Sequence, residues 1–220
     1  MKRLVQLINL SAKRESKDKM LVKRNIVVFD FDGTLSWRDS NFEFGKYCFK
    51  HSARPWMYLP LIVIAYIGRF FNPAGIWWRK AMRRFITPQM VRDFVPGFIT
   101  AHKKLRFDWA KSTVAHERAA GNIVILISAS TDYLVPRLVQ DMNFDVILTS
   151  KMNSDKPWQY DFLCWGPNKV IALDNWARKN KIIPNVIRAY SDSKSDLPIM
   201  NIAKEQIWVD RKTGSRMKKH

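Results

Sequence analysis

Two aspartates follow directly after an apolar, strand-like run near the start of the chain. Residues 26–29 read Ile-Val-Val-Phe, and Asp30, Phe31 and Asp32 come next. Because side chains alternate along a strand, Asp30 and Asp32 are predicted to project to the same side. Two like charges so close together are stable only when a cation neutralises them or one of them holds a proton. The pattern therefore predicts a catalytic or metal-binding site rather than an ordinary acidic turn.

Two polar turns extend this chemistry. Gly33 permits a sharp exit from the first strand, and Thr34 places a hydroxyl beside the carboxylates. A second acidic turn, SDSKSD at residues 191–196, follows another apolar run. Asp192 in this turn is a candidate for completing a site of hard oxygen ligands for Mg²⁺, which needs only one or two carboxylates. Asp196 has two open interpretations, as part of the site or as the N-cap of the following helix.

Two further motifs carry weaker signals for phosphate binding. Ser128 and Ala129 follow the apolar run 123–127 and offer a hydroxyl and backbone amides to a phosphate oxygen, although such a serine is often a turn residue or a helix cap. Residues 166–169, GPNK, open a predicted helix and place the Lys169 ammonium near its start. A cation at the N-terminus of a helix is unfavourable for the helix dipole, so Lys169 is a candidate for binding a negative charge. The alternative interpretation is an ordinary surface lysine in contact with solvent.

The periodicity of the chain indicates the elements that bring these motifs together. Strand-like runs recur at residues 122–127, 145–148, 186–190 and 206–209, with an additional strand or hairpin at 159–165. Helical patterns lie between them at residues 133–142, 168–179 and 196–203. Strands that alternate with helices predict an α/β fold with a parallel sheet and right-handed crossovers. The motifs are expected to meet in the crevice beyond the carboxyl ends of the strands.

A long helical stretch interrupts this alternation between the first and second strands. Residues 36–121 have the pattern of successive helices, with Thr87 and Pro88 at the start of one and Gly121 at the end of the last. We interpret this stretch as a helical cap inserted into the core. The predicted organisation is a basic extension at residues 1–24, a core at 25–35 and 122–210, the cap at 36–121, and a frayed basic tail at 211–220.

The composition predicts a folded, soluble chain with polyanionic partners. The 220 residues are 47% hydrophobic, and 38 Lys and Arg against 19 Asp and Glu give a net charge of +19 and a pI near 10.2. Such an excess favours nucleic acid, an anionic membrane surface or phosphorylated substrates, while a merely soluble surface is the alternative. Cys48 and Cys164 fall in different parts of the predicted fold, so no disulfide is expected and a reducing compartment fits. The apolar patch at residues 4–10 is too short for a signal peptide.

In this order, the motifs resemble those of the haloacid dehalogenase superfamily of phosphohydrolases, over most of the chain. The resemblance implies a doubly wound, mainly parallel, Rossmann-like sheet with the helical cap of the subclass that includes phosphoserine phosphatase. It also implies that Asp30 is the nucleophile and Asp32 the general acid and base in the hydrolysis of a phosphate monoester. The phosphoryl group would be bound by Gly33, Ser128, Ala129 and Lys169, and Mg²⁺ by Asp30, Asp32, Asp192 and Asp196. Ser191 departs from the pattern, since many relatives have glycine there.

The predicted cap contains an apolar segment with basic flanks. Residues 55–68 carry no charge, and a second apolar group follows Arg69. The segment is shorter than the roughly 20 residues that one membrane-crossing helix needs. The core strands on both sides of the insertion belong to one sheet, so a single crossing is excluded. A helical hairpin at residues 55–86, turning at 72–75, satisfies both conditions, and it either packs on the core or dips into one membrane leaflet.

The acidic turn near Asp192 and the proline-interrupted apolar cap resemble those of the phosphatidylglycerophosphatase C group in particular. This resemblance implies a lipid-phosphate phosphatase on the cytoplasmic side of the bacterial inner membrane, with phosphatidylglycerophosphate as its substrate. A soluble phosphatase for a small phosphorylated metabolite is the first alternative. The second is a basic nucleic-acid-binding protein on the same scaffold, although the sequence contains no recognisable nucleic-acid-binding module.

Overall fold

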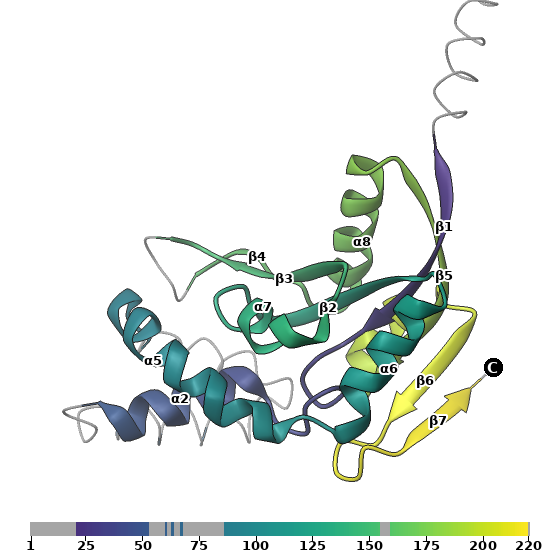
Figure 1. Ribbon diagram of the computed structural model, residues 1–220. Coiled ribbons are helices and arrows are strands. Elements are labelled where there is room, and N and C mark those ends of the chain that lie inside the picture. The colour runs from purple at the N-terminus through teal and green to yellow at the C-terminus, as the bar shows by residue number, and fades with distance from the viewer. Residues whose placement is uncertain are drawn as a thin grey trace, which may run out of the picture.

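Seven strands among the described residues form the central sheet of the computed structural model (Figure 1). The structure describes residues 21–52, 86–154 and 159–219, together with residues 60, 63 and 67. The strands lie in the order β4-β3-β2-β1-β5-β6-β7, and only the edge strands β4 and β7 pair in an antiparallel direction. Their bounds are β1 (Val22–Phe29), β2 (Ile123–Thr131), β3 (Val146–Met152), β4 (Tyr160–Phe162), β5 (Ile182–Ser191), β6 (Glu205–Val209) and β7 (Arg216–Lys219). The predicted α/β fold with a mainly parallel sheet is confirmed.

The second half of the central strand β1, residues 26–29, is buried on both faces because helices cover both sides of the sheet (Figure 1). Val27 and Phe29 belong to the apolar cluster that includes side chains of α2 (Ser40–His51), α5 (Pro88–His102), α6 (Asp108–Ala119) and α7 (Val135–Leu138). Ile26 and Val28 belong to the other cluster, with α8 (Pro167–Lys179) and α9 (Leu197–Met200). A parallel strand that is covered on both faces explains the unbroken apolar run before Asp30.

The insertion between β1 and β2 is helical, as predicted. α5 begins at Pro88, and the hydroxyl of its N-cap residue Thr87 accepts a hydrogen bond from the Met90 amide at 3.2 Å. α2 and α5 pack through the rings of Phe44 and Phe98, whose centroids are 5.2 Å apart. Although α6 falls within the range predicted for the cap, it packs against β2 as a helix of the core. Most of the predicted apolar hairpin, residues 55–86, lies outside the described residues.

Two basic segments form strands that the sequence pattern did not indicate. β1 begins at Val22, inside the predicted extension, because Val22 pairs with Ile182 of β5. The tail at residues 211–220 was predicted to be frayed, and this prediction is wrong for Arg216–Lys219, which form β7 against β6. An edge strand gains backbone pairing on one side while charged side chains remain in solvent, so a basic composition does not prevent it. Residues 1–20 of the predicted extension lie outside the described residues.

The predicted helices differ from the observed ones mainly in length. The pattern at residues 168–179 corresponds to α8, and the additional strand predicted at 159–165 is β4. The helix predicted at 133–142 is only α7 followed by the 3-10 turn η3 (Gln140–Met142), and it ends where Asn143 adopts a left-handed conformation with φ 54°. The helix predicted at 196–203 is reduced to the turn η4 (Lys194–Asp196) and the short α9.

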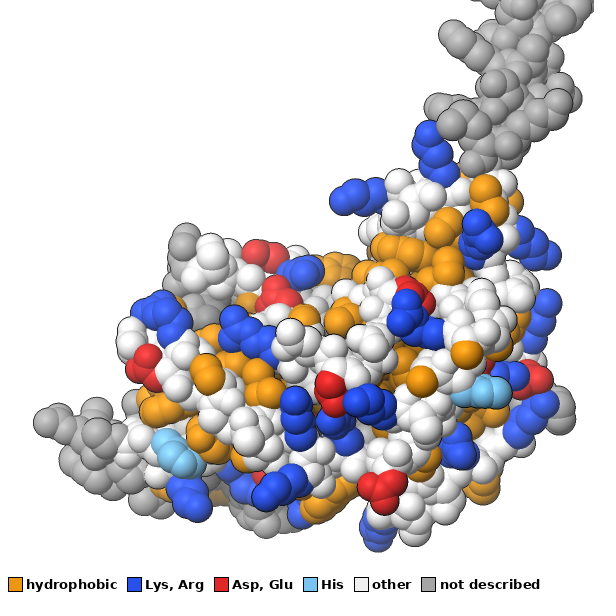
Figure 2. All heavy atoms as spheres, in the orientation of Figure 1, with side chains coloured by type: hydrophobic (Ala, Val, Ile, Leu, Met, Phe, Trp, Pro, Cys, Tyr) orange, Lys and Arg blue, Asp and Glu red, His pale blue; other side chains and the backbone are white. Residues whose placement is uncertain are grey.

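The remaining predictions about the chain concern its cysteines and its surface. Cys48 and Cys164 are free and lie in the apolar clusters on opposite faces of the sheet, so the expectation of no disulfide between them is confirmed. In the described part of the chain, no helix combines the length and the apolar character that crossing a bilayer requires. On the face drawn in Figure 2, Lys and Arg side chains are spread over the surface rather than gathered in one stripe.

Candidate active site

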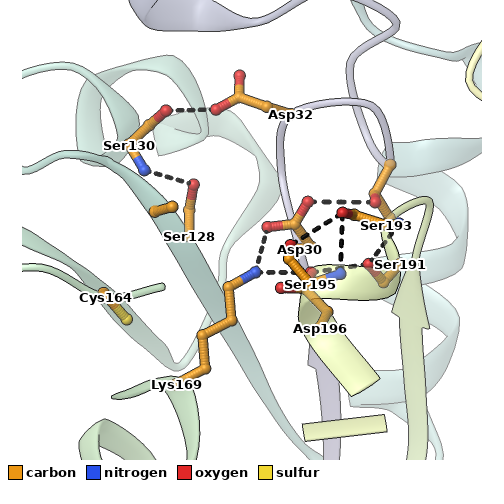
Figure 3. Close-up of polar contacts among 12 residues, drawn as sticks. Asp30, Asp32, Ser128, Ser130, Cys164, Lys169, Ser191, Ser193, Ser195 and Asp196 are labelled. Atoms are coloured by element: carbon orange, nitrogen blue, oxygen red, sulfur yellow. Dashed lines mark hydrogen bonds and ion pairs between the residues drawn. The ribbon is translucent and has the colours of Figure 1, made fainter. Parts of the chain in front are cut away.

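The carboxyl ends of β1, β2 and β5 and the start of α8 surround a small cavity of about 90 Å³ (Figure 3). Residues from distant parts of the sequence line it: Asp30, Asp32, Asp39, Ser128, Ala129, Trp165, Lys169, Asp192, Ser193, Ser195, Asp196 and Arg211. The crevice therefore lies where the order of the motifs along the strands predicted it. Of the predicted site residues, Gly33 alone is missing from this lining.

Asp30 and Lys169 form a buried ion pair at the centre of the cavity. Asp30 follows β1, and its amide donates to the Tyr190 carbonyl at 3.0 Å, which fixes it beside the end of β5. Lys169 lies in the first turn of α8 and is 2% exposed, with its Nζ 2.7 Å from Asp30 Oδ1. Burial raises the pKa of Asp30 to about 7, although the Lys169 ammonium acts in the opposite direction. Lys169 is thus an internal cation and not the solvated surface lysine of the alternative interpretation.

Asp196 completes this pairing from the opposite side of Lys169. Its Oδ2 accepts hydrogen bonds from Lys169 Nζ and from the Ser191 hydroxyl, both at 2.7 Å. Asp196 occupies the N-cap position of α9 but makes no side-chain capping bond, so its carboxylate serves the cavity and not the helix. Burial disfavours the Lys169 ammonium, yet Asp30 and Asp196 outweigh this effect and keep the pKa of Lys169 above its usual value. Asp196 is placed to hold Lys169, and its predicted role as a metal ligand stays a prediction.

Asp192 and Asp30 share one hydroxyl group. Thr34 Oγ1 lies 3.3 Å from Asp30 Oδ2 and 3.4 Å from Asp192 Oδ1, and it accepts a hydrogen bond from the Asp192 amide at 3.1 Å. The two carboxylates therefore lie on either side of Thr34. Burial raises the pKa of Asp192 to about 7, and the nearby charge of Asp30 adds to the effect. The two acidic motifs therefore lie close together, as predicted, and Thr34 connects them.

Gly33 serves the site through its conformation. Its φ is +89°, and a Cβ atom at this position would lie 2.1 Å from Asp192 Oδ2. Only glycine accommodates both the backbone geometry and the close approach of Asp192. The Gly33 amide donates to the Ser36 carbonyl at 2.6 Å. The Gly33 amide is already paired and Gly33 does not line the cavity, so its predicted part in phosphate binding stays a prediction without support from this geometry.

Asp32 lies across the cavity from the Lys169 cluster, beside Ser130 (Figure 3). Its Oδ2 accepts a short hydrogen bond from the Ser130 hydroxyl, and its Oδ1 accepts one from the Ser40 amide at 2.6 Å. Asn41 in turn donates to Ser130 Oγ at 2.8 Å, which connects α2 to this carboxyl group. Burial raises the pKa of Asp32 to about 6, with Asp39 as the next cause. The two aspartates thus face one cavity with different partners, as an acid and a nucleophile require.

Ser128 and Ala129, near the end of β2, line another side of the cavity. Ser128 is 1% exposed, and its Oγ accepts a hydrogen bond from the Ser130 amide at 3.1 Å. This bond leaves the hydroxyl hydrogen of Ser128 available for an acceptor in the cavity. The geometry is compatible with the predicted contact to a phosphate oxygen.

The family relationship accounts for this arrangement. A family model described as haloacid dehalogenase-like hydrolase matches residues 27–201, which includes both acidic motifs and the whole insertion. The chain belongs to this family. The predicted enzymatic character, that of a hydrolase, is thereby confirmed. No curated protein matches the sequence of this hydrolase.

Solved structures share the fold of this hydrolase at low sequence identity. A Bordetella pertussis Tohama I protein of unknown function is 15% identical, with a TM-score of 0.72 over 88% of this chain and 93% of the other. A phosphoserine phosphatase with a phospho-aspartyl intermediate analogue is 16% identical, with a TM-score of 0.60 over 85% and 87% of the two chains. A phosphoserine phosphohydrolase-like protein from Francisella tularensis is 19% identical, with a TM-score of 0.55 over 86% and 87%. These likenesses extend to the sheet and to the helical insertion.

The residues of the hydrolase cavity fit a hard divalent cation such as Mg²⁺. The described residues contain no cluster of three or more His, Cys, Asp or Glu side chains suited to a metal. Mg²⁺ does not need such a cluster, because it retains water and takes substrate oxygens alongside one or two carboxylates. Asp30 and Asp192 offer this pair on either side of Thr34, and their raised pKa values reflect a pair of buried acids that a cation would stabilise. Both oxygens of Asp32 accept hydrogen bonds, from the Ser130 hydroxyl and the Ser40 amide, and its predicted role as a metal ligand stays a prediction.

Sequence reasoning missed three residues that shape the hydrolase site. Ser130 holds Asp32, Ser191 holds Asp196, and Arg211 reaches the cavity from the loop after β6. Ser130 was detectable in principle, because it stands two residues after Ser128 at the end of a strand and so shares its side. Arg211 gave no signal, since it lies in a segment predicted to be a frayed tail.

Proposed function

We propose that this hydrolase is a Mg²⁺-dependent phosphomonoesterase that works through an aspartyl-phosphate on Asp30. The observation that supports it most strongly is the environment of the Asp30 carboxylate. Lys169 binds its Oδ1 at 2.7 Å, and its Oδ2 lies beside the Thr34 hydroxyl that Asp192 shares. A phosphate monoester repels nucleophiles, so an attacking carboxylate needs nearby positive charge to offset that repulsion. Bound Mg²⁺ would supply the remainder of this charge neutralisation.

The proposed reaction has two steps. An Asp30 oxygen attacks phosphorus, and the bond from phosphorus to the ester oxygen breaks as Asp32 donates its proton to the leaving alcohol. Asp32 then takes a proton from a water molecule, whose oxygen attacks phosphorus and releases inorganic phosphate and the free Asp30 carboxylate. Ser128, Ala129 and Lys169 hold the phosphoryl oxygens during both steps. Burial, which raises the pKa of Asp32 to about 6, favours the protonated form that the first step requires.

We further propose a lipid phosphate, such as phosphatidylglycerophosphate, as the substrate. Support comes from Pro60, Val63 and Ile67, which are helical and exposed within the predicted apolar segment, Val63 by 48% and Ile67 by 50%. Exposed apolar side chains on a chain with a net charge of +19 favour contact with an anionic membrane surface.

A soluble phosphate ester of a small metabolite is the second candidate. It is favoured by the lining of the cavity, which is mainly charged and hydroxyl-bearing side chains and so suits a polar ester. Binding of nucleic acid is disfavoured, because five aspartates line the cavity and the basic side chains visible in Figure 2 do not form a stripe.

The test is a phosphate-release screen with Mg²⁺ over lipid and soluble phosphomonoesters, with Asp30→Asn as the control. We expect release from phosphatidylglycerophosphate in anionic vesicles and none from the variant. Activity confined to soluble esters, with no binding to vesicles, would select the second candidate. Absence of release from every phosphomonoester, together with steeply salt-dependent binding to DNA or RNA, would overturn the phosphatase proposal.

A further inference from the structure

Arg211 brings a positive charge to the mouth of the cavity. It lines the cavity, its side chain is 48% exposed, and its Nε lies 4.0 Å from Asp192 Oδ2. The other cation among the lining residues, Lys169, is 2% exposed and is bound by Asp30 and Asp196. Of the two cations among the described lining residues, Arg211 is therefore the one whose side chain is exposed at the mouth of the cavity.

The loop that carries Arg211 is closed by hydrogen bonds to Asp210. Asp210 donates from its amide to the Ser215 carbonyl and accepts at its own carbonyl from the Gly214 amide, both at 2.8 Å. Asp210 Oδ1 also accepts from the amides of Lys212 and Thr213, at 2.9 and 2.8 Å. These bonds close the turn between β6 and β7 on both sides of Arg211. A turn fixed in this way presents the guanidinium with little loss of backbone entropy on binding.

The same loop is seated on the core. Gly214 is buried with φ +72°, and a Cβ atom there would lie 2.6 Å from the ring of Phe107, the N-cap residue of α6. The loop therefore lies against the start of α6 with no space between backbone and ring. This contact fixes the position of the Arg211 loop relative to the cavity.

The charge balance of the cavity defines what Arg211 can bind. Five of the lining residues are aspartates, so a substrate with a second anionic group beside its phosphomonoester meets repulsion unless a cation faces that group. At 4.0 Å, Arg211 pairs with Asp192 without a hydrogen bond, and its fork of N–H donors is available to a ligand. Guanidinium groups bind carboxylates and phosphates through two parallel hydrogen bonds.

We propose that Arg211 is a specificity-determining residue that binds a second anion on the leaving group of the substrate. The inference rests on the proposed phosphomonoesterase activity. The anion is a carboxylate on a soluble ester or a phosphodiester on a lipid. Because Arg211 touches the leaving group and not the phosphoryl group, it acts on substrate binding more than on the chemical step.

The test compares substrates with and without the second anion in Arg211→Gln and Arg211→Lys. The soluble pair is phosphoglycolate and ethyl phosphate, and the lipid pair is phosphatidylglycerophosphate and phosphatidic acid. In Arg211→Gln we expect KM to rise about tenfold or more for the member with the second anion, and to stay within about twofold for its partner. Arg211→Lys should recover part of the loss, since it keeps the charge but not the fork. Lys212→Gln, an exposed residue on the same loop, is the matched control and should change neither pair.

Two results would overturn the inference. One is an equal change in KM for both members of each pair. The other is a rise in the Mg²⁺ activation constant with every substrate, which would make Arg211 a positioning residue for Asp192. Either result leaves the phosphatase proposal intact, whereas a wild-type enzyme that hydrolyses none of the four esters defeats the proposed function itself. A larger loss with the soluble pair or with the lipid pair identifies the source of the anion.

Discussion

The Nζ atom of Lys169 lies 2.7 Å from Asp30 Oδ1 and 2.7 Å from Asp196 Oδ2, and the lysine side chain is 2% exposed. A charge triad removed from water costs more desolvation free energy than an apolar cluster of the same volume. The triad joins the residues after β1 and β5 to the first turn of α8, inside the cavity, so a role in the proposed reaction accounts for it better than a gain in stability does. The same geometry makes the triad sensitive to the loss of one member.

Lys169→Met should therefore abolish phosphate release and destabilise the fold. It leaves the buried carboxylates of Asp30 and Asp196 without a cation, and we expect a loss of about 3–5 kcal/mol in the free energy of unfolding, measured with urea. Adding Asp196→Asn should return part of that loss without restoring activity. Lys179→Met, at the exposed end of the same helix, is the control and should change stability little. A Lys169→Met protein as stable as the wild type would contradict the triad.

Gly33→Ala should weaken Mg²⁺ activation. The added Cβ would collide with Asp192 Oδ2, so Asp192 has to move, and we expect the Mg²⁺ activation constant to rise about tenfold, or about 1.4 kcal/mol. Gly121→Ala is a matched control, because Gly121 has a similar φ of +80° with no atom within 4 Å of the new Cβ. That control should lose about 1 kcal/mol of stability from backbone strain and keep its Mg²⁺ response. Equal Mg²⁺ responses in the two variants would show that the collision is unimportant.

Ser130→Ala should affect substrates according to their leaving groups. Ser130 and the Ser40 amide hold the Asp32 carboxyl group, and a misplaced acid slows the protonation of a poor leaving group. We expect turnover of ethyl phosphate to fall about tenfold or more, while p-nitrophenyl phosphate, whose leaving group needs no proton, changes by less than about threefold. Ser112→Ala, on the exposed side of α6, serves as the comparison. A uniform loss with both esters would instead assign Ser130 to phosphate binding.

His102 should make the fold sensitive to acid. It is 1% exposed, neither ring nitrogen has a hydrogen-bond partner among the described residues, and burial followed by the charge of Arg106 lowers its pKa from 6.5 to about 4. Between these two values the unfolded chain binds more protons, so stability falls as the pH falls from 6.5 to 4, by about 3 kcal/mol. His102→Phe should remove this part of the pH dependence in denaturant titrations at pH 7 and pH 4. The exposed His116→Phe should not, and identical pH profiles for wild type and His102→Phe would refute the assignment.

The place where the site residues meet was predictable from the sequence because it depends on residues near the ends of strands. A strand that is buried on both faces gives an unbroken apolar run, and the polar residue that ends the run, such as Asp30 or Ser128, must lie near the carboxyl end of the strand. The parallel sheet then brings these strand ends together whatever the length of the insertions. Lys169 was found in the same way, from its place at the start of α8.

Other features were not predictable because they depend on contacts between distant segments. The carboxylate of Asp196 has the local sequence of a helix cap, and only the approach of Lys169 from α8 turns it toward the cavity. The amide of Gly33 donates a hydrogen bond to the Ser36 carbonyl, and no strand pattern in the sequence indicates this contact. Arg211 belongs to a basic stretch without apolar periodicity, and its position follows from the pairing of β7 with β6 and the contact of Gly214 with Phe107.

The most direct measurement is the trapping of a phosphoryl group on Asp30. In Asp32→Asn the nucleophile is intact but the water of the second step lacks its base, so p-nitrophenyl phosphate should phosphorylate the enzyme and stop there. We predict a burst of nitrophenolate equal to the enzyme concentration, and a peptide containing Asp30 that carries one phosphoryl group after acid quenching. Asp30→Asn with Asp32→Asn should give neither. Steady release of nitrophenolate by Asp32→Asn without an adduct, or an adduct on any other residue, would contradict the assignment of Asp30 as the nucleophile.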